Sequence, residues 1–184
     1  FDEYAGAKEM VSFERYCLAR MKGELVNAPA VIGTFRLNED DYMLVREFIE
    51  GKTLSDVPLD DKMLDQILGD VRLMHEHGFV HGDIKLDNFL VSEGTVYIVD
   101  CLKVGYTGFH EAKSFDLICT ICAMCQKAPV SRVLEHAREY FSETELHQAG
   151  KLLDIAVSKV DIELSDEQVR ELRRALSNPI LDIS

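Results

Sequence analysis

The sequence predicts an α+β protein in which one helix and two strands precede a mostly helical remainder. Apolar residues spaced three and four apart predict helices at residues 8–22 and 59–77. Between these helices, residues 31–37 and 42–49 have the composition of two strands, and the polar turn 38–40 joins them. Four more helices are expected in the second half of the chain, at residues 114–126 and at about 130–142, 144–160 and 166–177.

Capping residues mark several of the predicted helix starts. Ser142 with Glu145, and Ser165 with Gln168, have the spacing of a capping box, in which the two residues satisfy each other's free backbone N–H groups. Asp60 suits the start of the second helix, because a negative charge there complements the helix dipole. These signals place the helix boundaries independently of the apolar pattern.

Gly78 is expected to end the helix at 59–77 as its C-cap. His75 and His77 precede it and lie two positions apart, so they do not share one helix face. We therefore predict surface or cap positions for both histidines rather than a metal site.

Composition narrows the class of protein. The chain has 184 residues, 47% of them apolar, which is enough for one domain or two small lobes with a buried core. Its net charge of −13 argues against a nucleic-acid surface and against docking on anionic membranes. Neither a membrane-spanning run nor a signal peptide is visible. Because the first residue is Phe1 rather than Met, we expect the sequence to begin inside a longer gene product.

The chain contains five cysteines, at Cys17, Cys101, Cys119, Cys122 and Cys125. An odd number, with three in one apolar run, indicates reduced thiols and a cytoplasmic location. The spacing Cys119-x-x-Cys122-x-x-Cys125 also occurs in iron–sulfur ligation. No fourth cysteine lies nearby, however, and residues three apart on a helix are better explained as small core side chains.

The polar stretch His81–Asn88 and the following strand, which ends at Asp100, carry the strongest chemical signal. Asp83 and Asn88 lie five residues apart in the predicted loop, and a short hairpin through the tight turn 92–94 returns Asp100 toward them. Two carboxylates and an amide at strand ends can hold a divalent metal on a phosphate. The competing interpretation is an Asp/Asn-rich turn, which is common in proteins. The order and context of these residues favour the metal–phosphate site.

The pattern H-x-D-x-K-x-x-N with a downstream Asp resembles the catalytic and metal-binding loops of protein kinases. The variant His-Gly-Asp resembles the atypical RIO family, the kinase subunit of the tRNA threonylcarbamoylation complex, and the aminoglycoside and choline phosphotransferases. The resemblance spans about residues 8–126 and implies a bilobal kinase-like fold. It places a reduced N-lobe at residues 1–50 and a helical C-lobe with the catalytic loop at residues 51–184.

The resemblance implies a role for each residue of the loop. Asp83 would be the catalytic base that orients the attacking hydroxyl, and Lys85 would neutralise charge on the transferred phosphoryl group. Asn88 and Asp100 would bind Mg²⁺ on the phosphates of ATP. His81 would hold the loop by packing and hydrogen bonding.

The nucleotide side of the site is implied less directly. Glu14, with Glu9 as the alternative, would be the helix carboxylate that pairs with a strand lysine. The carbonyl of Glu47 and the amide of Ile49 would face the adenine edge of ATP. Arg46 would occupy the gatekeeper position, where kinases usually have an apolar residue.

The sequence also departs from the kinase pattern. Nothing resembles G-x-G-x-x-G, and Lys8 lies at a helix start rather than in a strand. Cys101-Leu102 stands where Phe-Gly is usual, and the short segment 103–113 contains no Ala-Pro-Glu motif. Asp116 resembles the buried Asp that ties the central helix of the C-lobe to the catalytic loop. The missing features leave three explanations open: a sequence that omits N-terminal residues, a fold without those strands, or a pseudokinase.

We therefore predict an ATP- and Mg²⁺-dependent serine/threonine protein kinase of RIO-like, atypical type. The alternatives are a small-molecule or sugar phosphotransferase, which the short segment after Asp100 favours, and a nucleotide-binding pseudokinase scaffold, which Arg46 and the missing lysine favour. The expected partner is a protein substrate with a Ser or Thr hydroxyl. A further partner protein could dock on the helices after residue 126. Direct binding to nucleic acid or membrane is not expected.

Overall fold

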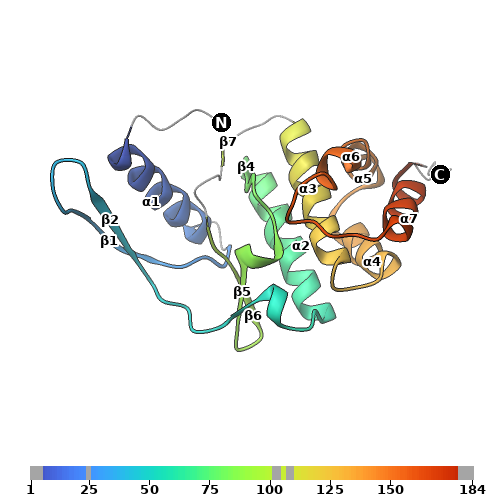
Figure 1. The fold of residues 1–184 in the computed structure, drawn as a ribbon, viewed down its shortest axis with the longest axis horizontal. Coiled ribbons are helices and arrows are strands. Elements are labelled where there is room, and N and C mark those ends of the chain that lie inside the picture. Colours follow the sequence, from blue (N-terminus) through green and yellow to red (C-terminus); the bar gives the residue numbers. More distant parts are fainter. Residues whose placement is uncertain (1–5, 24–25, 101–104, 107–109, 178–184) are drawn as a thin grey trace.

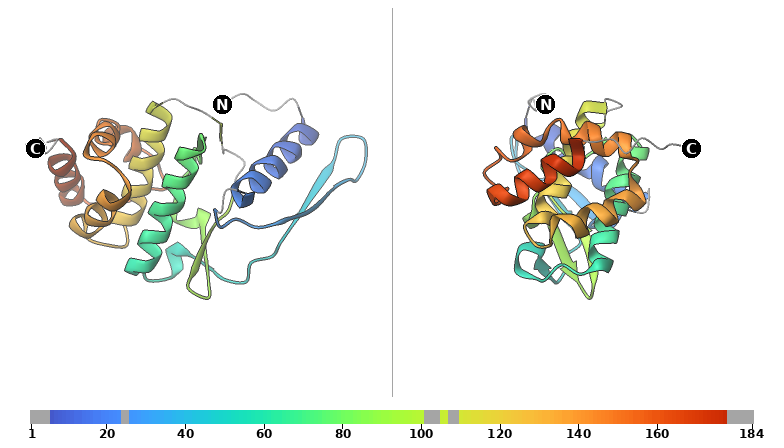
Figure 2. Two further views of the ribbon diagram at one scale, coloured as in Figure 1. Left: turned by 180° about the vertical axis from the view of Figure 1, so that it is seen from behind. Right: turned by 90° about the vertical axis from the view of Figure 1, so that its right-hand side faces the viewer.

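In the computed structural model of this chain, residues 6–23, 26–100, 105–106 and 110–177 are described. The N-terminal part contains helix α1 (Ala7–Gly23) and an antiparallel hairpin of strands β1 (Val31–Arg36) and β2 (Tyr42–Arg46). Figures 1 and 2 show this hairpin extending away from the rest of the molecule, with α1 packed beside it. We call α1, β1 and β2 together the small part.

The remainder, which we call the helical part, begins after the hairpin. Its helices are α2 (Asp61–Glu76), α3 (His110–Cys125), α4 (Val130–Tyr140), α5 (Glu143–Gly150), α6 (Leu153–Ala156) and α7 (Asp166–Ser177). Its strands are β3 (Lys52–Thr53), β4 (Phe79–Val80), β5 (Phe89–Ser92), β6 (Thr95–Ile98) and β7 (Gly105–Tyr106). Strands β3, β5 and β6 form one small sheet, and β4 pairs with β7. This mixture of helices and small sheets confirms the predicted α+β class.

Local sequence explains the turns on either side of the site. The β5–β6 turn places Glu93 and Gly94 at φ values of 48° and 75°, which is the left-handed pair that a two-residue hairpin favours. At the other hairpin, the side chain of Asn38 accepts hydrogen bonds from the backbone N–H groups of Asp40 and Asp41, both at 2.9 Å. Both predicted turns are therefore confirmed.

Helix α2 follows the predicted boundaries closely. Asp60 caps its start by accepting a hydrogen bond of 2.8 Å from the N–H of Met63, and Gly78 follows its end with a φ of 81°. The predicted surface position of His75 is wrong, because this side chain is buried against α3. His75 follows Val71 by four residues and therefore continues the buried face of the helix.

The core of the helical part surrounds α3, whose residues from Asp116 to Cys125 are all buried. Cys119, Cys122 and Cys125 are among them, which confirms that they are core side chains. Burial raises the pKa of Cys119 and of Cys125 to about 12, so these thiols stay protonated. Among the described helices, none combines the length and apolar character needed to cross a bilayer.

The long helix expected at 144–160 is wrong, because the chain forms two helices there. Helix α5 ends at Gly150 and α6 begins at Leu153. A side chain at Gly150 would come within 2.6 Å of the Cβ of Leu176 on α7, so only glycine allows these helices to pack. The capping-box pairs at Ser142–Glu145 and Ser165–Gln168 are confirmed by reciprocal hydrogen bonds.

Candidate active site

The loop that carries the predicted catalytic residues lies between β4 and β5 and is tied to α3 through Asp116. The backbone N–H groups of His81 and Gly82 each donate a hydrogen bond of 2.9 Å to its carboxylate, one to each oxygen. The Nε2 atom of His75 lies 3.2 Å from the same carboxylate. Burial alone would raise the pKa of Asp116, but these donors outweigh burial and lower it. The predicted link between α3 and the loop is confirmed.

Two features shape the start of this loop. Gly82 has a φ of 77°, a conformation that is costly for residues with a Cβ atom. His81 is buried, and its Nδ1 atom lies 3.3 Å from the N–H of Asp83 while Nε2 lies 3.4 Å from the carbonyl of Val99. These partners assign the proton to Nε2, and burial lowers the pKa of the ring. His81 therefore holds the loop as a neutral side chain.

Asn88 closes the loop on its other side. Its side-chain Nδ2 atom donates a 2.8 Å hydrogen bond to the backbone carbonyl of Asp83. The backbone carbonyl of Asn88 accepts a 2.9 Å bond from the N–H of Val99. The side chain is buried. Because the amide nitrogen is used in the loop, the Oδ1 atom is the group that Asn88 can offer a metal.

Asp100 lies two residues beyond the end of β6 and has a φ of 60°. The left-handed conformation costs a non-glycine residue about 1 kcal/mol, and Asp tolerates it better than most. Such strain is common where a side chain must be aimed at a functional site. Here Asp100 lines a hollow of about 700 Å³ together with Asn88, Glu14 and Arg46. The structure thus brings two predicted metal ligands to one surface.

The donor set of this hollow fits Mg²⁺. Mg²⁺ prefers hard oxygen ligands and keeps several waters, so one carboxylate and one amide oxygen suffice when phosphates supply the rest. Within the described ranges, no three His, Cys, Asp or Glu side chains gather in an arrangement suited to a metal ion. A metal here would therefore be held by Asp100, Asn88 and a bound phosphate, and the assignment of these roles remains a prediction.

The carboxylate of Asp83 lies between two lysines. The Nζ atom of Lys85 is 3.7 Å from Oδ2, and that of Lys159 is 3.4 Å from Oδ1. Lys85 was predicted from the loop pattern, whereas Lys159 was not. Lys159 comes from the segment after α6, 76 residues along the chain, and no spacing rule connects residues so far apart. One unbroken helix was expected at 144–160, so no sequence signal pointed to the turn that carries Lys159.

On the nucleotide side, Glu14 lines the hollow and Glu9 lies exposed in the first turn of α1. The carboxylate of Glu14 is 3.2 Å from the guanidinium of Arg46 on β2. Burial raises the pKa of Glu14, Arg46 partly offsets this, and the charge of Asp100 adds to the increase. Glu14 is therefore close to Asp100, and Arg46, expected at the gatekeeper position, is its ion-pair partner.

The predicted adenine-binding segment lies just beyond β2. This strand ends at Arg46, three residues before the expected end at Ile49, so the strand prediction was too long. The carboxylate of Glu47 accepts a 3.0 Å hydrogen bond from the N–H of Ala30 and lies 3.5 Å from the ammonium of Lys22. The expected roles of the Glu47 carbonyl and the Ile49 amide stay predictions. Cys101 and Leu102 lie outside the described residues.

Comparison with known proteins places this geometry in context. Residues 28–119 match a family model described as "Lipopolysaccharide core biosynthesis protein (WaaY)". The matched range contains the loop, Asp100 and Asp116.

Several of the similar proteins have names that identify them as kinases. The chain is 31% identical to the KEOPS complex subunit Bud32 of Pyrococcus abyssi over 116 residues, which are 60% of this chain and 51% of that protein. It is 37% identical over 60 residues to the lipopolysaccharide core heptose(II) kinase WaaY of Escherichia coli, covering 32% of this chain and 26% of that protein. A probable serine/threonine-protein kinase KIN1 homolog of Encephalitozoon cuniculi is 25% identical over 91% of this chain and 31% of its own length. The chain thus spans about half of one relative and less of the others, and the predicted kinase-like fold is confirmed.

Proposed function

Because the chain belongs to the WaaY family of lipopolysaccharide core biosynthesis proteins, we propose that it is the catalytic part of an ATP-dependent phosphotransferase that uses Mg²⁺. The observation that carries this proposal is the placement of Asn88, Asp100, Glu14 and Arg46 around one hollow, beside the loop that presents Asp83. The hollow can hold the metal and the phosphates of ATP, and Asp83 lies beside it as the base that orients the attacking hydroxyl. Phosphoryl transfer requires both of these parts.

Each residue has a definite task in this proposal. Asp100 and Asn88 hold Mg²⁺, which neutralises the outer phosphates of ATP. Asp83 accepts a hydrogen bond from the attacking hydroxyl and orients it, and Lys85 offsets charge on the transferred group. Asp116 acts indirectly, because it fixes the backbone of the loop on which Asp83 sits. We assign residues 1–50 to the nucleotide-binding lobe and residues 51–184 to the catalytic lobe.

A serine or threonine hydroxyl of a protein is our first candidate for the acceptor. Lys85 supports it, because the resemblance of the loop to protein kinases includes this lysine. The names of several relatives, such as serine/threonine-protein kinase PrkC of Bacillus subtilis, also point in this direction. The reduced thiols suit a cytoplasmic protein, and the helices after residue 126 could bind a partner protein.

A sugar hydroxyl is the second candidate, and the family match favours it. The matching E. coli protein is named a heptose(II) kinase. In addition, only nine residues separate Asp100 from the first residue of α3 at His110, which leaves little chain for docking a peptide.

The test uses the full-length gene product that contains this chain. Labelled ATP and Mg²⁺ are supplied with protein acceptors or with sugars, and Asp83→Ala, Asp100→Ala and Asp154→Ala are compared. Asp154 is an exposed carboxylate paired with Arg173 and serves as the matched control. We expect the first two variants to lose at least about 100-fold in transfer rate, and Asp154→Ala to keep it. Transfer by Asp83→Ala at the wild-type rate would contradict the proposal.

A binding measurement tests the metal ligands separately. Asp100→Asn removes a metal-binding carboxylate oxygen but keeps the shape of the side chain. We expect it to weaken the binding of ATP when Mg²⁺ is present and to leave binding in excess chelator unchanged. Equal effects with and without Mg²⁺ would show that Asp100 does not bind the metal.

A further inference from the structure

Among the described residues, Lys159 is a cation next to the catalytic loop that the proposed reaction does not yet use. Its Nζ atom lies 3.4 Å from Oδ1 of Asp83 and 3.4 Å from the carbonyl oxygen of Ile84. Lys85 faces the other oxygen of the same carboxylate. Each oxygen of the proposed base therefore has an ammonium group beside it.

The fold holds Lys159 in this place. It lies in a turn that continues α6, in which its N–H donates to the carbonyl of Ala156 at 3.1 Å and its carbonyl accepts from Ile162 at 3.2 Å. Ala156 and Ile162 are both buried, so the turn is anchored on either side. In Figure 1 the segment between α6 and α7, drawn in orange, comes back toward α3 and the centre of the molecule. The side chain of Lys159 is only 19% exposed.

Electrostatic contacts with α3 support the same position. Burial raises the pKa of Cys119, the charge of Lys159 lowers it in part, and the charge of Asp83 adds to the increase. Lys159 and Asp83 therefore both lie close to one buried residue of α3. The Lys159 ammonium belongs to the interior of the site rather than to its outer surface.

Two ammonium groups approach the carboxylate of Asp83, and the acidic Asp116 also lies nearby on α3. The separations of 3.4 and 3.7 Å are longer than the 2.7–2.9 Å of a tight charge-assisted hydrogen bond. A partly buried ammonium with such loose contacts keeps donors for another anion. Lys85 is assigned to the transferred phosphoryl group, which leaves Lys159 for the acceptor.

We propose that Lys159 binds an anionic group, a phosphate or a carboxylate, which the acceptor carries close to its attacked hydroxyl. The inference rests on the proposed phosphotransfer and narrows its acceptor class. Asp83 orients the hydroxyl, and Lys159 beside it fixes the neighbouring anion. Neutral acceptors lack this contact.

The first test measures anion binding and needs no transfer. Lysines of the full-length protein are labelled as ¹³C-dimethyl-lysine, and the Lys159 resonance is identified by its loss in Lys159→Arg. Inorganic phosphate is titrated in the presence of Mg²⁺ and a non-hydrolysable ATP analogue, with chloride at equal ionic strength as the comparison. Glucose 6-phosphate against glucose, and an acidic peptide against its neutral amide form, distinguish the two sources of the anion.

We expect phosphate, and at least one of the two anionic probes, to shift the Lys159 resonance saturably, while the neutral probes leave it in place. Lys151 is the internal control, because it is exposed and hydrogen-bonded to Gln148 at 3.0 Å. Equal shifts at Lys151 and Lys159, or none at Lys159, would overturn the proposal. This result does not depend on catalysis, so a failed transfer assay and a failed anion site are told apart.

The second test uses the acceptor identified in the transfer assay, with and without its anionic group. We expect Lys159→Ala to raise KM for the anionic acceptor by about 10- to 100-fold, the cost of losing one hydrogen bond to a charged group. The KM for ATP should stay within about twofold, and Lys159→Arg should retain most of the affinity. On the neutral acceptor, Lys159→Ala should raise KM much less than it does on the anionic acceptor. A kcat loss that is equal for both acceptors would assign Lys159 a merely structural role.

Discussion

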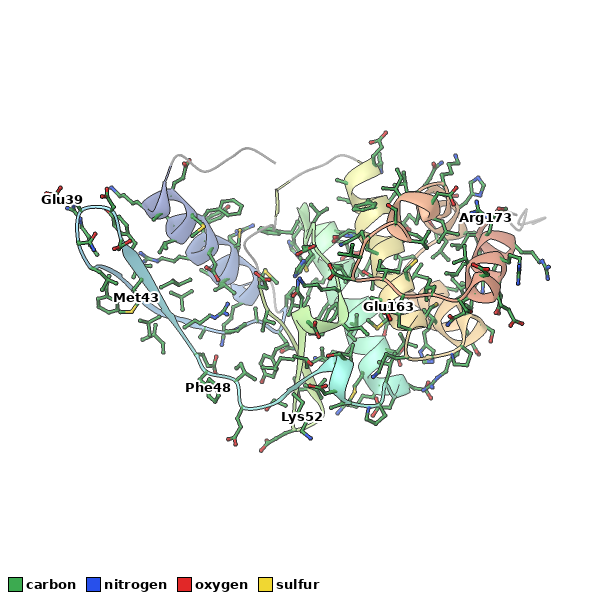
Figure 3. The ribbon with its side chains drawn as sticks, in the orientation of Figure 1. Glu39, Met43, Phe48, Lys52, Glu163 and Arg173 are labelled. Carbon is green, nitrogen blue, oxygen red and sulfur yellow. The ribbon has the colours of Figure 1, made fainter. Side chains whose placement is uncertain are left out.

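In the helical part, Ile67 and the other apolar side chains of α2 that face α3 are shielded from solvent, whereas in the hairpin of the small part Ile32 is 69% exposed. Phe48, just beyond β2, is 87% exposed, and Figure 3 shows it pointing away from the ribbon. A two-stranded hairpin is marginally stable alone, and here α1 is the described element that packs against it. The loop with Asp83 therefore rests on a buried core, while Arg46 rests on a much less buried support.

This difference divides the proposed site. The groups that orient the hydroxyl and hold the metal belong to the helical part, and the Glu14–Arg46 pair belongs to the small part. We expect substitutions in the helical part to change global stability and substitutions in the hairpin to act locally. The predictions below test that expectation in order of decreasing effect.

The largest effect is expected at Asp116. Asp116→Ala removes the acceptor of two backbone N–H groups and leaves His75 without its carboxylate. Breaking a buried charged network by removing one partner costs about 3–5 kcal/mol. We expect a loss of that order in urea unfolding, together with loss of phosphoryl transfer.

The matched control is Glu47→Ala, just beyond β2. Its carboxylate also accepts a backbone hydrogen bond, from Ala30, and lies near Lys22. Because Glu47 is accessible to solvent, we expect a much smaller loss than for Asp116→Ala. Equal losses for the two variants would contradict the expectation that the buried helical core, and not the hairpin region, sets global stability.

The next comparison substitutes the same residue type in each part. Ile67→Ala removes a fully buried side chain on α2 and is expected to cost about 2–5 kcal/mol, because it leaves a cavity. Ile32→Ala removes an exposed side chain on β1 and should cost less than about 1 kcal/mol, chiefly from β-propensity. Thermal and urea unfolding of both variants measure the difference. A large loss for Ile32→Ala would indicate that the hairpin face is covered in solution.

The third prediction concerns pH. Asp70 on α2 is buried, its Oδ2 atom has no hydrogen-bond partner among the described residues, and burial raises its pKa from 3.8 to about 7. In the folded state the group therefore stays protonated above its unfolded pKa, so the wild type should lose stability as pH rises from about 4 to about 7. Each unit of pKa difference corresponds to about 1.4 kcal/mol.

Asp70→Asn cannot ionise and should lack this loss, so it should be more stable than the wild type above pH 7 and similar to it below pH 4. Urea unfolding at several pH values measures the effect. Glu14→Gln in the small part should act in the same direction but more weakly, because Arg46 offsets part of the burial. Parallel pH profiles for wild type and Asp70→Asn would contradict the assignment.

The sequence predicted those parts of the site that depend on local order. Asp83, Asn88 and Asp100 lie within one loop and one hairpin, so the turn at 92–94 was enough to bring them together. Asp116 was found because the resemblance covered it. The helix and strand types were predictable for the same reason: apolar spacing and capping residues act over a few positions.

The contacts that the sequence could not predict join residues far apart in the chain. Lys159 reaches Asp83 across 76 positions, and its approach depends on the turn that follows α6. Arg46 pairs with Glu14 across 32 positions. His75 continues the buried face of α2 that contains Val71, and its spacing from His77 does not reveal this. Tertiary packing decides such contacts, and spacing alone does not contain it.

The smallest expected effect compares two capping side chains. Ser142 accepts a hydrogen bond from the N–H of Glu145 at the start of α5, and Asn38 accepts two in the hairpin turn. Ser142→Ala should lower the free energy of unfolding by about 1 kcal/mol, because the cap lies in the part that unfolds globally. Asn38→Ala should leave global unfolding unchanged and instead speed amide hydrogen exchange of β1 and β2, since the hairpin opens locally. If Asn38→Ala lowered global stability as much as Ser142→Ala, the hairpin would unfold together with the helical core, and the two parts would be one cooperative unit.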